Sequence, residues 1–175
     1  MRNLAAVERD AGNLDWALKL VAVERDAGSL DWALNLVVTA LDASHQAGHR
    51  RLVADALHTL GLVRLAVGDV DAALDHHMRA LELTRAAGNG HSETKALLGL
   101  VAGESVRGAR EPALRHAGLA LALARAAGYR LHEGPASSLR ARISDDACDA
   151  RRATELFTEL GLTAKCWQRA LLPPT

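Results

Sequence analysis

Glycine recurs at a constant interval along this chain, and this interval constrains the fold more than any other feature of the sequence. Two series keep it, Gly28, Gly68 and Gly108, and Gly48, Gly88 and Gly128. Small and apolar residues between the glycines keep the same step: Ala33, Ala73 and Ala113; Leu34, Leu74 and Leu114; Ala40, Ala80 and Ala120; Leu41, Leu81 and Leu121. The sequence therefore predicts stacked units of about 40 residues, a length typical of helical repeats.

The glycines are expected to mark helix ends, because glycine readily adopts the left-handed conformation that closes a helix. Alanine and leucine dominate the apolar residues, and both enter helices at little cost. Apolar positions recur at three- and four-residue spacing, as in Leu74, Met78 and Leu81. We therefore expect antiparallel helix pairs, with helices near 3–11, 14–27, 29–47, 50–66, 69–87, 90–106, 109–126, 130–144, 146–160 and 163–171.

Residues 5–20 and 21–36 are almost identical and suggest a competing, much shorter period. In one continuous helix this shift would turn Trp32 about 160° away from the face of Trp16. The two side chains can share a core only if breaks at Gly12 and Gly28 start new helices. We interpret the duplication as a copied helix–turn–helix junction, which predicts a less regular N-terminal end.

Residues 54–87 resemble a tetratricopeptide repeat. The family pattern of a large residue, Leu-Gly and later small residues is matched by Leu57, Leu60-Gly61, Gly68, Ala73 and Ala80. Arg64 and His77 stand where the pattern usually has aromatic residues, and the unit is longer than the usual ~34 residues. These departures resemble the degenerate repeats in C-terminal regions of bacterial antibiotic-regulatory, LuxR-type and NTPase-switch regulators.

The resemblance implies an all-α fold, a right-handed α-solenoid of antiparallel helix pairs. It implies one domain over 1–175, with irregular N-terminal helices at 1–27, repeat-length units at 28–67, 68–107 and 108–147, and capping helices at 148–175.

It also implies a concave groove lined by the first helix of each unit, which would bind a protein or peptide segment. Family positions carried onto this sequence assign the groove to Asp55, His58, Leu62, Leu65, Glu93, Ala96, Leu100, Glu104, Glu133 and Arg140, with Ala136 beside them. We refer to these as the inner-surface residues. Carboxylates alternating with apolar side chains predict a ligand with basic residues between apolar anchors.

Charge and hydropathy exclude some classes of binding partner. Lysine plus arginine and aspartate plus glutamate number 21 each, so no net field would gather nucleic acid or an anionic membrane. No apolar run approaches the ~20 residues of a membrane span. Two cysteines are too few for a disulfide framework, so we expect a soluble protein in the reducing cytoplasm.

Structural roles explain the residues that could otherwise indicate catalysis or metal binding. His45 and His49 have a spacing that metal ligands use, but Gly48 separates them, and a cation at a helix C-terminus explains His45. Cys148 and Cys166 lack a CxxC partner and are interpreted as buried or half-buried thiols. Trp16, Trp32 and Trp167 are interpreted as core or end-cap residues. We expect no cofactor, no metal and no enzymatic activity.

The sequence predicts a non-catalytic binding module, the sensor or partner-docking segment of a bacterial transcriptional regulator. A free-standing scaffold or assembly protein, oligomerising through the ends of the array, and a small-peptide receptor are the alternatives. A winged-helix or P-loop segment encoded upstream would favour the regulator.

Overall fold

The structure is a computed structural model that describes residues 27–46 and 48–161. These residues form helices and the turns between them, with no strand in either range. The helices are α2 (Ala27–Gln46), α3 (Arg50–Ala66), α4 (Val70–Ala86), α5 (Gly90–Arg107), α6 (Arg110–Ala126), α7 (Arg130–Ser144) and α8 (Ala147–Glu159). The expected helices at 3–11 and 163–171 lie outside the described residues, as does most of the one at 14–27.

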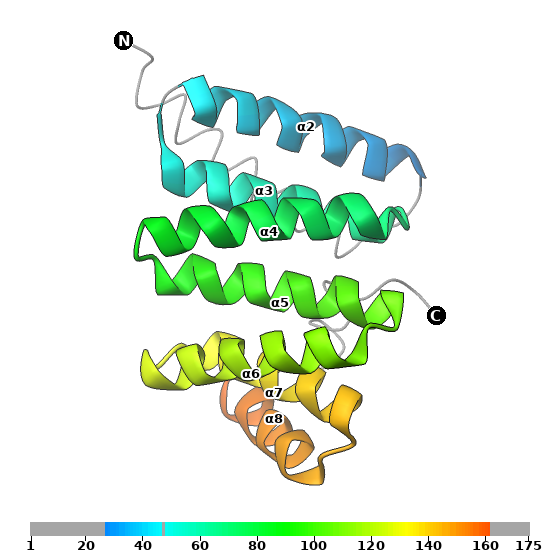
Figure 1. The fold of residues 1–175 in the computed structure, drawn as a ribbon, viewed down its shortest axis with the longest axis vertical. Coiled ribbons are helices and arrows are strands. Elements are labelled where there is room, and N and C mark those ends of the chain that lie inside the picture. Colours follow the sequence, from blue (N-terminus) through cyan, green and yellow to red (C-terminus); the bar gives the residue numbers. More distant parts are fainter. Residues whose placement is uncertain (1–26, 47, 162–175) are drawn as a thin grey trace.

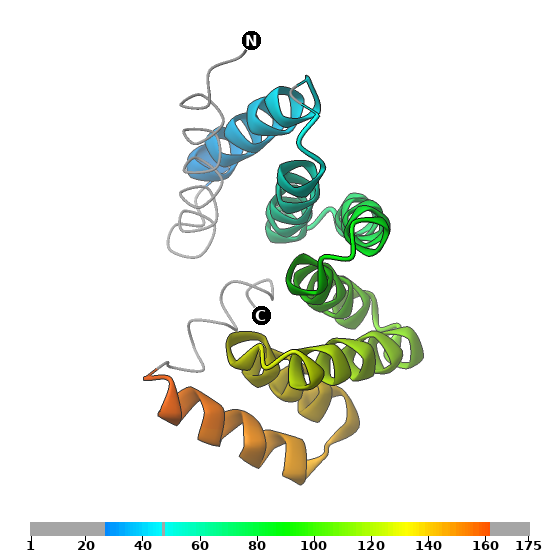
Figure 2. The same ribbon diagram turned by 90° about the vertical axis from the view of Figure 1, so that its left-hand side faces the viewer.

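Consecutive helices pack antiparallel and stack along the long axis of the molecule (Figure 1). In the view turned by 90°, α3 and α5 lie on one side of the stack and α4 lies on the other (Figure 2). Contacts also join α3 to α5 and α5 to α7. The first helices of successive units thus form a continuous layer, and the predicted all-α solenoid of helix pairs is confirmed.

Glycine turns end the helices as predicted at Gly48, Gly68, Gly88, Gly108 and Gly128, all of which have positive φ. Directly after Gly68 in the sequence, the N–H of Asp69 donates to the carbonyl oxygen of Arg64 at 2.9 Å. This hydrogen bond caps the end of α3. The Asp69 side chain then accepts from the N–H of Ala72 and caps the start of α4. One short turn therefore closes α3 and opens α4.

One predicted helix end falls at the limit of the described residues. Gly28 is in the first turn of α2, and any helix that ends there would come from residues before Ala27, which lie outside the described residues. Trp32, predicted as a core or end-cap residue, is 47% exposed on α2 and is not a core residue. Trp16 and Trp167 lie outside the described residues. The interpretation of the duplicated N-terminal segment depends on residues before Ala27, which lie outside the described residues.

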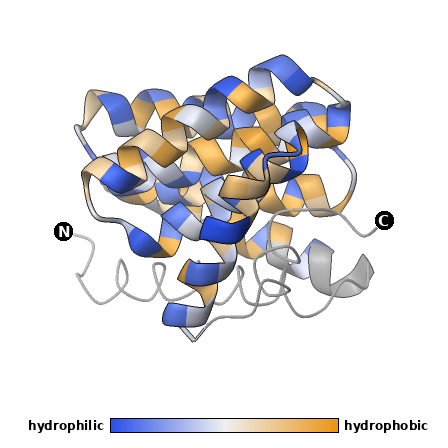
Figure 3. Ribbon diagram, turned by 90° about the horizontal axis from the view of Figure 1, so that it is seen from below, coloured by the Kyte–Doolittle hydropathy of each residue, from blue (hydrophilic) through white to orange (hydrophobic). Residues whose placement is uncertain are grey.

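The main core runs through α3 to α7 and is built largely from leucine and alanine. Ala73 and Ala113, which the repeat aligns with each other, are fully buried where helices cross. A second cluster joins α2 to α3 through Val37, Ala40 and Leu60. Hydrophobic and hydrophilic residues alternate along the helices (Figure 3), so each helix contributes to the core and to the surface.

Candidate functional site

The inner-surface residues all lie on the first helices of the units. Asp55, His58, Leu62 and Leu65 are on α3, Glu93, Ala96, Leu100 and Glu104 are on α5, and Glu133, Ala136 and Arg140 are on α7. Because α3 contacts α5 and α5 contacts α7, the predicted set follows one continuous layer of helices. Its role as a binding groove remains a prediction.

The uncharged inner-surface residues are buried in this structure. Relative exposure is 6% for His58, 4% for Leu62, 2% for Leu65 and 1% or less for Ala96, Leu100 and Ala136. Leu62, Leu65 and Leu100 belong to the main core cluster. These side chains therefore stabilise the stack, whatever else they contact.

The charged inner-surface residues are engaged in ion pairs within the chain. Asp55 on α3 lies 2.9 Å from the ammonium of Lys95 on α5 and accepts a hydrogen bond from Ser92. Asp55 and Lys95 are separated in the sequence by one repeat length, so one position of the repeat carries opposite charges in successive units. The pair joins two first helices.

A second ion pair recurs with the period of the repeat. Arg85 at the end of α4 lies 2.9 Å from Glu93 at the start of α5, and Arg125 lies 3.1 Å from Glu133 one unit later. Each pair spans a glycine turn and joins the second helix of one unit to the first helix of the next. Both carboxylates are therefore committed to contacts between units.

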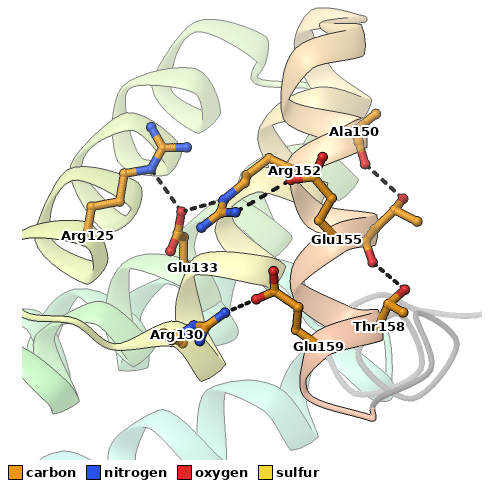
Figure 4. A network of polar contacts seen from close by, with 9 residues as sticks. Arg125, Arg130, Glu133, Ala150, Arg152, Glu155, Thr158 and Glu159 are labelled. Atoms are coloured by element: carbon orange, nitrogen blue, oxygen red, sulfur yellow. Dashed lines mark hydrogen bonds and ion pairs between the residues drawn. The ribbon is translucent and has the colours of Figure 1, made fainter.

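At the C-terminal end of the described array, the pair of Arg125 and Glu133 is part of a larger network of ion pairs (Figure 4). Glu133 also contacts Arg152 of α8 at 3.3 Å, and Arg130 pairs with Glu159. Arg140, another inner-surface residue, forms a two-pronged pair with the buried Asp149 of α8. These contacts fasten α8 to α7.

Glu104 completes the charged set. Its carboxylate lies 2.9 Å from Nδ1 of His116 on α6. Each inner-surface carboxylate thus has a cationic or imidazole partner in the chain. The surface is less acidic than its residue types suggest, and a basic ligand would compete with internal pairs.

Histidines form a buried cluster that the sequence did not predict. The rings of His58 and His77 are 5.2 Å apart, and neither nitrogen of His77 has a hydrogen-bond partner among the described residues. Burial, and secondarily the charge of His76, lowers the pKa of His77 to about 3. Burial also lowers the pKa of His58 well below its ordinary value, with smaller contributions from His77 and Lys95. Both rings are neutral at physiological pH.

Two glycines make room for His77. A Cβ at Gly61 would lie 2.5–2.8 Å from atoms of the imidazole ring, and a Cβ at Gly99 would be as close. Gly61 belongs to the Leu60-Gly61 pair of the repeat pattern, and Gly99 likewise follows a leucine, Leu98. In the sequence, the signal for this site is a large residue on α4 together with glycines on α3 and α5. Only the packing of the three helices shows that these residues belong to one site.

A second histidine group lies between α5 and α7. His91 and His132 are in edge contact with centroids 4.6 Å apart, and Tyr129 lies 5.5 Å from His91. Burial lowers the pKa of His132 to about 4, and the charges of His91 and Lys95 act in the same direction. His132 is therefore a third neutral, buried imidazole.

The remaining candidates show no built chemical site in the described part of the chain. Residues 27–46 and 48–161 contain no group of three metal-binding side chains. Cys148 is exposed, so its predicted burial is wrong, and Cys166 lies outside the described residues. His45 occupies the last turn of α2, where its cation can complement the helix dipole. In the same ranges no helix is long and apolar enough to cross a membrane.

Comparison with known proteins agrees with the arrangement in helix pairs. The family model of the tetratricopeptide repeat matches residues 16–86, which include α2, α3 and α4. Comparison with curated proteins finds no match. Residues 16–86 are therefore identified as tetratricopeptide repeats.

Proposed function

We propose that this chain is a non-catalytic module that binds a protein or peptide segment along its inner surface. The observation that carries the proposal is the continuous layer formed by α3, α5 and α7, which are joined by direct helix contacts. Successive units of such a layer can contact successive residues of one extended or helical ligand. The family membership of residues 16–86 supports a role in protein interaction.

The cellular setting is part of the proposal. The long, degenerate unit resembles repeats of bacterial regulators, so the module would serve as the sensor or docking segment of a cytoplasmic transcriptional regulator. A formal net charge of zero supports a protein ligand over a nucleic acid. A scaffold protein would share the binding surface but would lack an attached DNA-binding segment.

Capture of partners from native cell extract tests the binding surface. Asp55→Lys would place a cation beside Lys95 and would disturb the fold, so neutral isosteres are the sharper change. We expect Asp55→Asn combined with Glu93→Gln to reduce partner capture several-fold, because both carboxylates retain partial exposure, 24% and 21% of the side chain.

Glu82→Gln combined with Glu111→Gln is the matched control. Both glutamates are exposed on second helices and have no ion-pair partner among the described residues. The control pair should capture the same partners as the wild type, and thermal melting checks that all variants fold. Equal capture by both double variants would show that the inner surface is not the binding surface.

A further inference from the structure

A hollow of about 430 Å³ lies at the edge of the array, where the end of α5, the start of α6 and the end of α7 meet. Ala113 and Leu139, both buried, form its apolar floor with Ile143 beside them. Arg110 and Arg142 line it from α6 and α7. Its size is that of a site for a small molecule.

The two arginines have no polar partner within the described residues. Neither Arg110 nor Arg142 has a hydrogen bond or ion pair with any residue in 27–46 or 48–161. No acidic side chain lines the hollow. Two guanidinium groups therefore border an apolar floor without a counter-charge, whereas Arg125 at the other end of α6 and Arg140 on α7 are paired.

The polar lining departs from the repeat. In the preceding unit, the positions of Ser105, Arg110 and Arg142 are occupied by Leu65, Val70 and Ala102. Leu65 and Ala102 belong to the main core, and Val70 packs against it. The preceding unit thus has apolar packing at the positions where this unit has a hydroxyl and two cations. The repeat does not require these polar residues, so the hollow needs another explanation.

We propose that this hollow binds a small carboxylic acid with an aliphatic chain. Guanidinium groups bind carboxylates through paired, charge-assisted hydrogen bonds, which are stronger than neutral ones. The chain of the acid would cover Leu139 and Ile143 and remove their remaining apolar surface from water. An inorganic anion would leave the floor uncovered, and a neutral lipid would leave the arginines unpaired. The proposal is independent of partner binding at the inner surface, whose residues are separate from this lining.

Titration with octanoate, followed by calorimetry and by amide NMR shifts, tests the site in the full chain. We expect saturable binding, with the largest shifts at Ser105, Gly108 and Ala113, and affinity at least tenfold above those of acetate and octan-1-ol. Arg110→Gln and Arg142→Gln should each weaken octanoate binding about tenfold or more. Arg115→Gln is the matched control, because Arg115 is exposed on α6, has no ion pair or hydrogen bond with another described residue and does not line the hollow.

Several results would overturn the proposal. Octan-1-ol binding as tightly as octanoate would show that the arginines do not recognise the charge. Unchanged affinity in the two arginine variants, or shifts confined to other helices, would place the ligand elsewhere. Tighter binding of an acetylated tripeptide with a free C-terminal leucine would assign the same chemistry to a polypeptide end instead of a free acid. Loss of partner capture in the inner-surface variants has no bearing on these outcomes.

Discussion

His77 should make the array sensitive to acid, and the size of the effect follows from its burial. An unfolded histidine takes up a proton with a pKa near 6.5, whereas the pKa of folded His77 is lowered to about 3. The neutral ring therefore contributes its full stability above pH 6.5. That contribution is lost progressively as the pH falls from 6.5 towards 3, because the unfolded chain binds the proton and the folded chain does not.

The expected loss is about 1.4 kcal/mol per pH unit for one such histidine, or about 2 kcal/mol between pH 7 and pH 5. His132, with its pKa lowered to about 4, adds a similar amount over the same interval. Together they remove about 4 kcal/mol, a large part of the ~5–15 kcal/mol that stabilises a typical domain. The pKa of His58 is lowered as well, so this residue makes the loss of stability with falling pH steeper.

Urea unfolding followed by circular dichroism at pH 7 and pH 5 measures this loss. His77→Phe keeps a ring at the position but cannot take up a proton, so its loss between the two pH values should be about 2 kcal/mol smaller than that of the wild type. Comparing the two pH values within one variant cancels any packing cost of the larger ring. The exposed, non-titrating Leu119 provides the control, and Leu119→Gln should keep the wild-type acid sensitivity. Equal losses in His77→Phe and wild type would refute the assignment of a buried neutral imidazole.

Two further predictions concern packing. Gly99→Ala should lower the free energy of unfolding by roughly 1–3 kcal/mol, because the new Cβ meets the buried His77 ring. Gly118→Ala, where no atom lies within 4 Å of the added Cβ, should instead raise it by up to ~1 kcal/mol through helix propensity, and urea unfolding distinguishes the two signs. Ala73→Arg and Ala113→Arg each put a charge at a fully buried helix crossing and should lower stability by a few kcal/mol, given overpacking costs of roughly 1–3 kcal/mol before the charge is counted. Wild-type melting temperatures in these arginine variants would contradict the alignment of the repeats.

The sequence predicted helix limits well because local signals set them. The helix expected at 90–106 is Gly90–Arg107, and the one expected at 130–144 is Arg130–Ser144. A glycine with positive φ and a capping side chain act over a few residues, so sequence order alone reveals them. Gly118 shows the limit of this reasoning, since a glycine can also be accommodated inside a helix at a modest cost.

The candidate site was less predictable because it depends on contacts between distant positions. Sequence reasoning placed Asp55 on a first helix but could not show that Lys95, at the same position of the next unit, would neutralise it. It treated His77 as a departure from the repeat pattern, although Gly61 and Gly99 accommodate its ring. The free arginines of the hollow were missed for the same reason, since pairing of Arg110 and Arg142 depends on which side chains surround them.

The fit of His77 between two glycines has a consequence for how this array can change by duplication. One unit later the equivalent positions hold Ala117 in place of the ring, and Val101 and Leu139 in place of the glycines. All three are buried. In this unit the large side chains of the layer come from the first helices, whereas one unit earlier the large side chain, His77, comes from the second helix. Exchanging a single helix between the two units would set bulk against bulk at one junction and leave a void at the other. Repeats that look interchangeable by their period are therefore individually matched to their neighbours, and new units can enter only where the adjoining residues change with them.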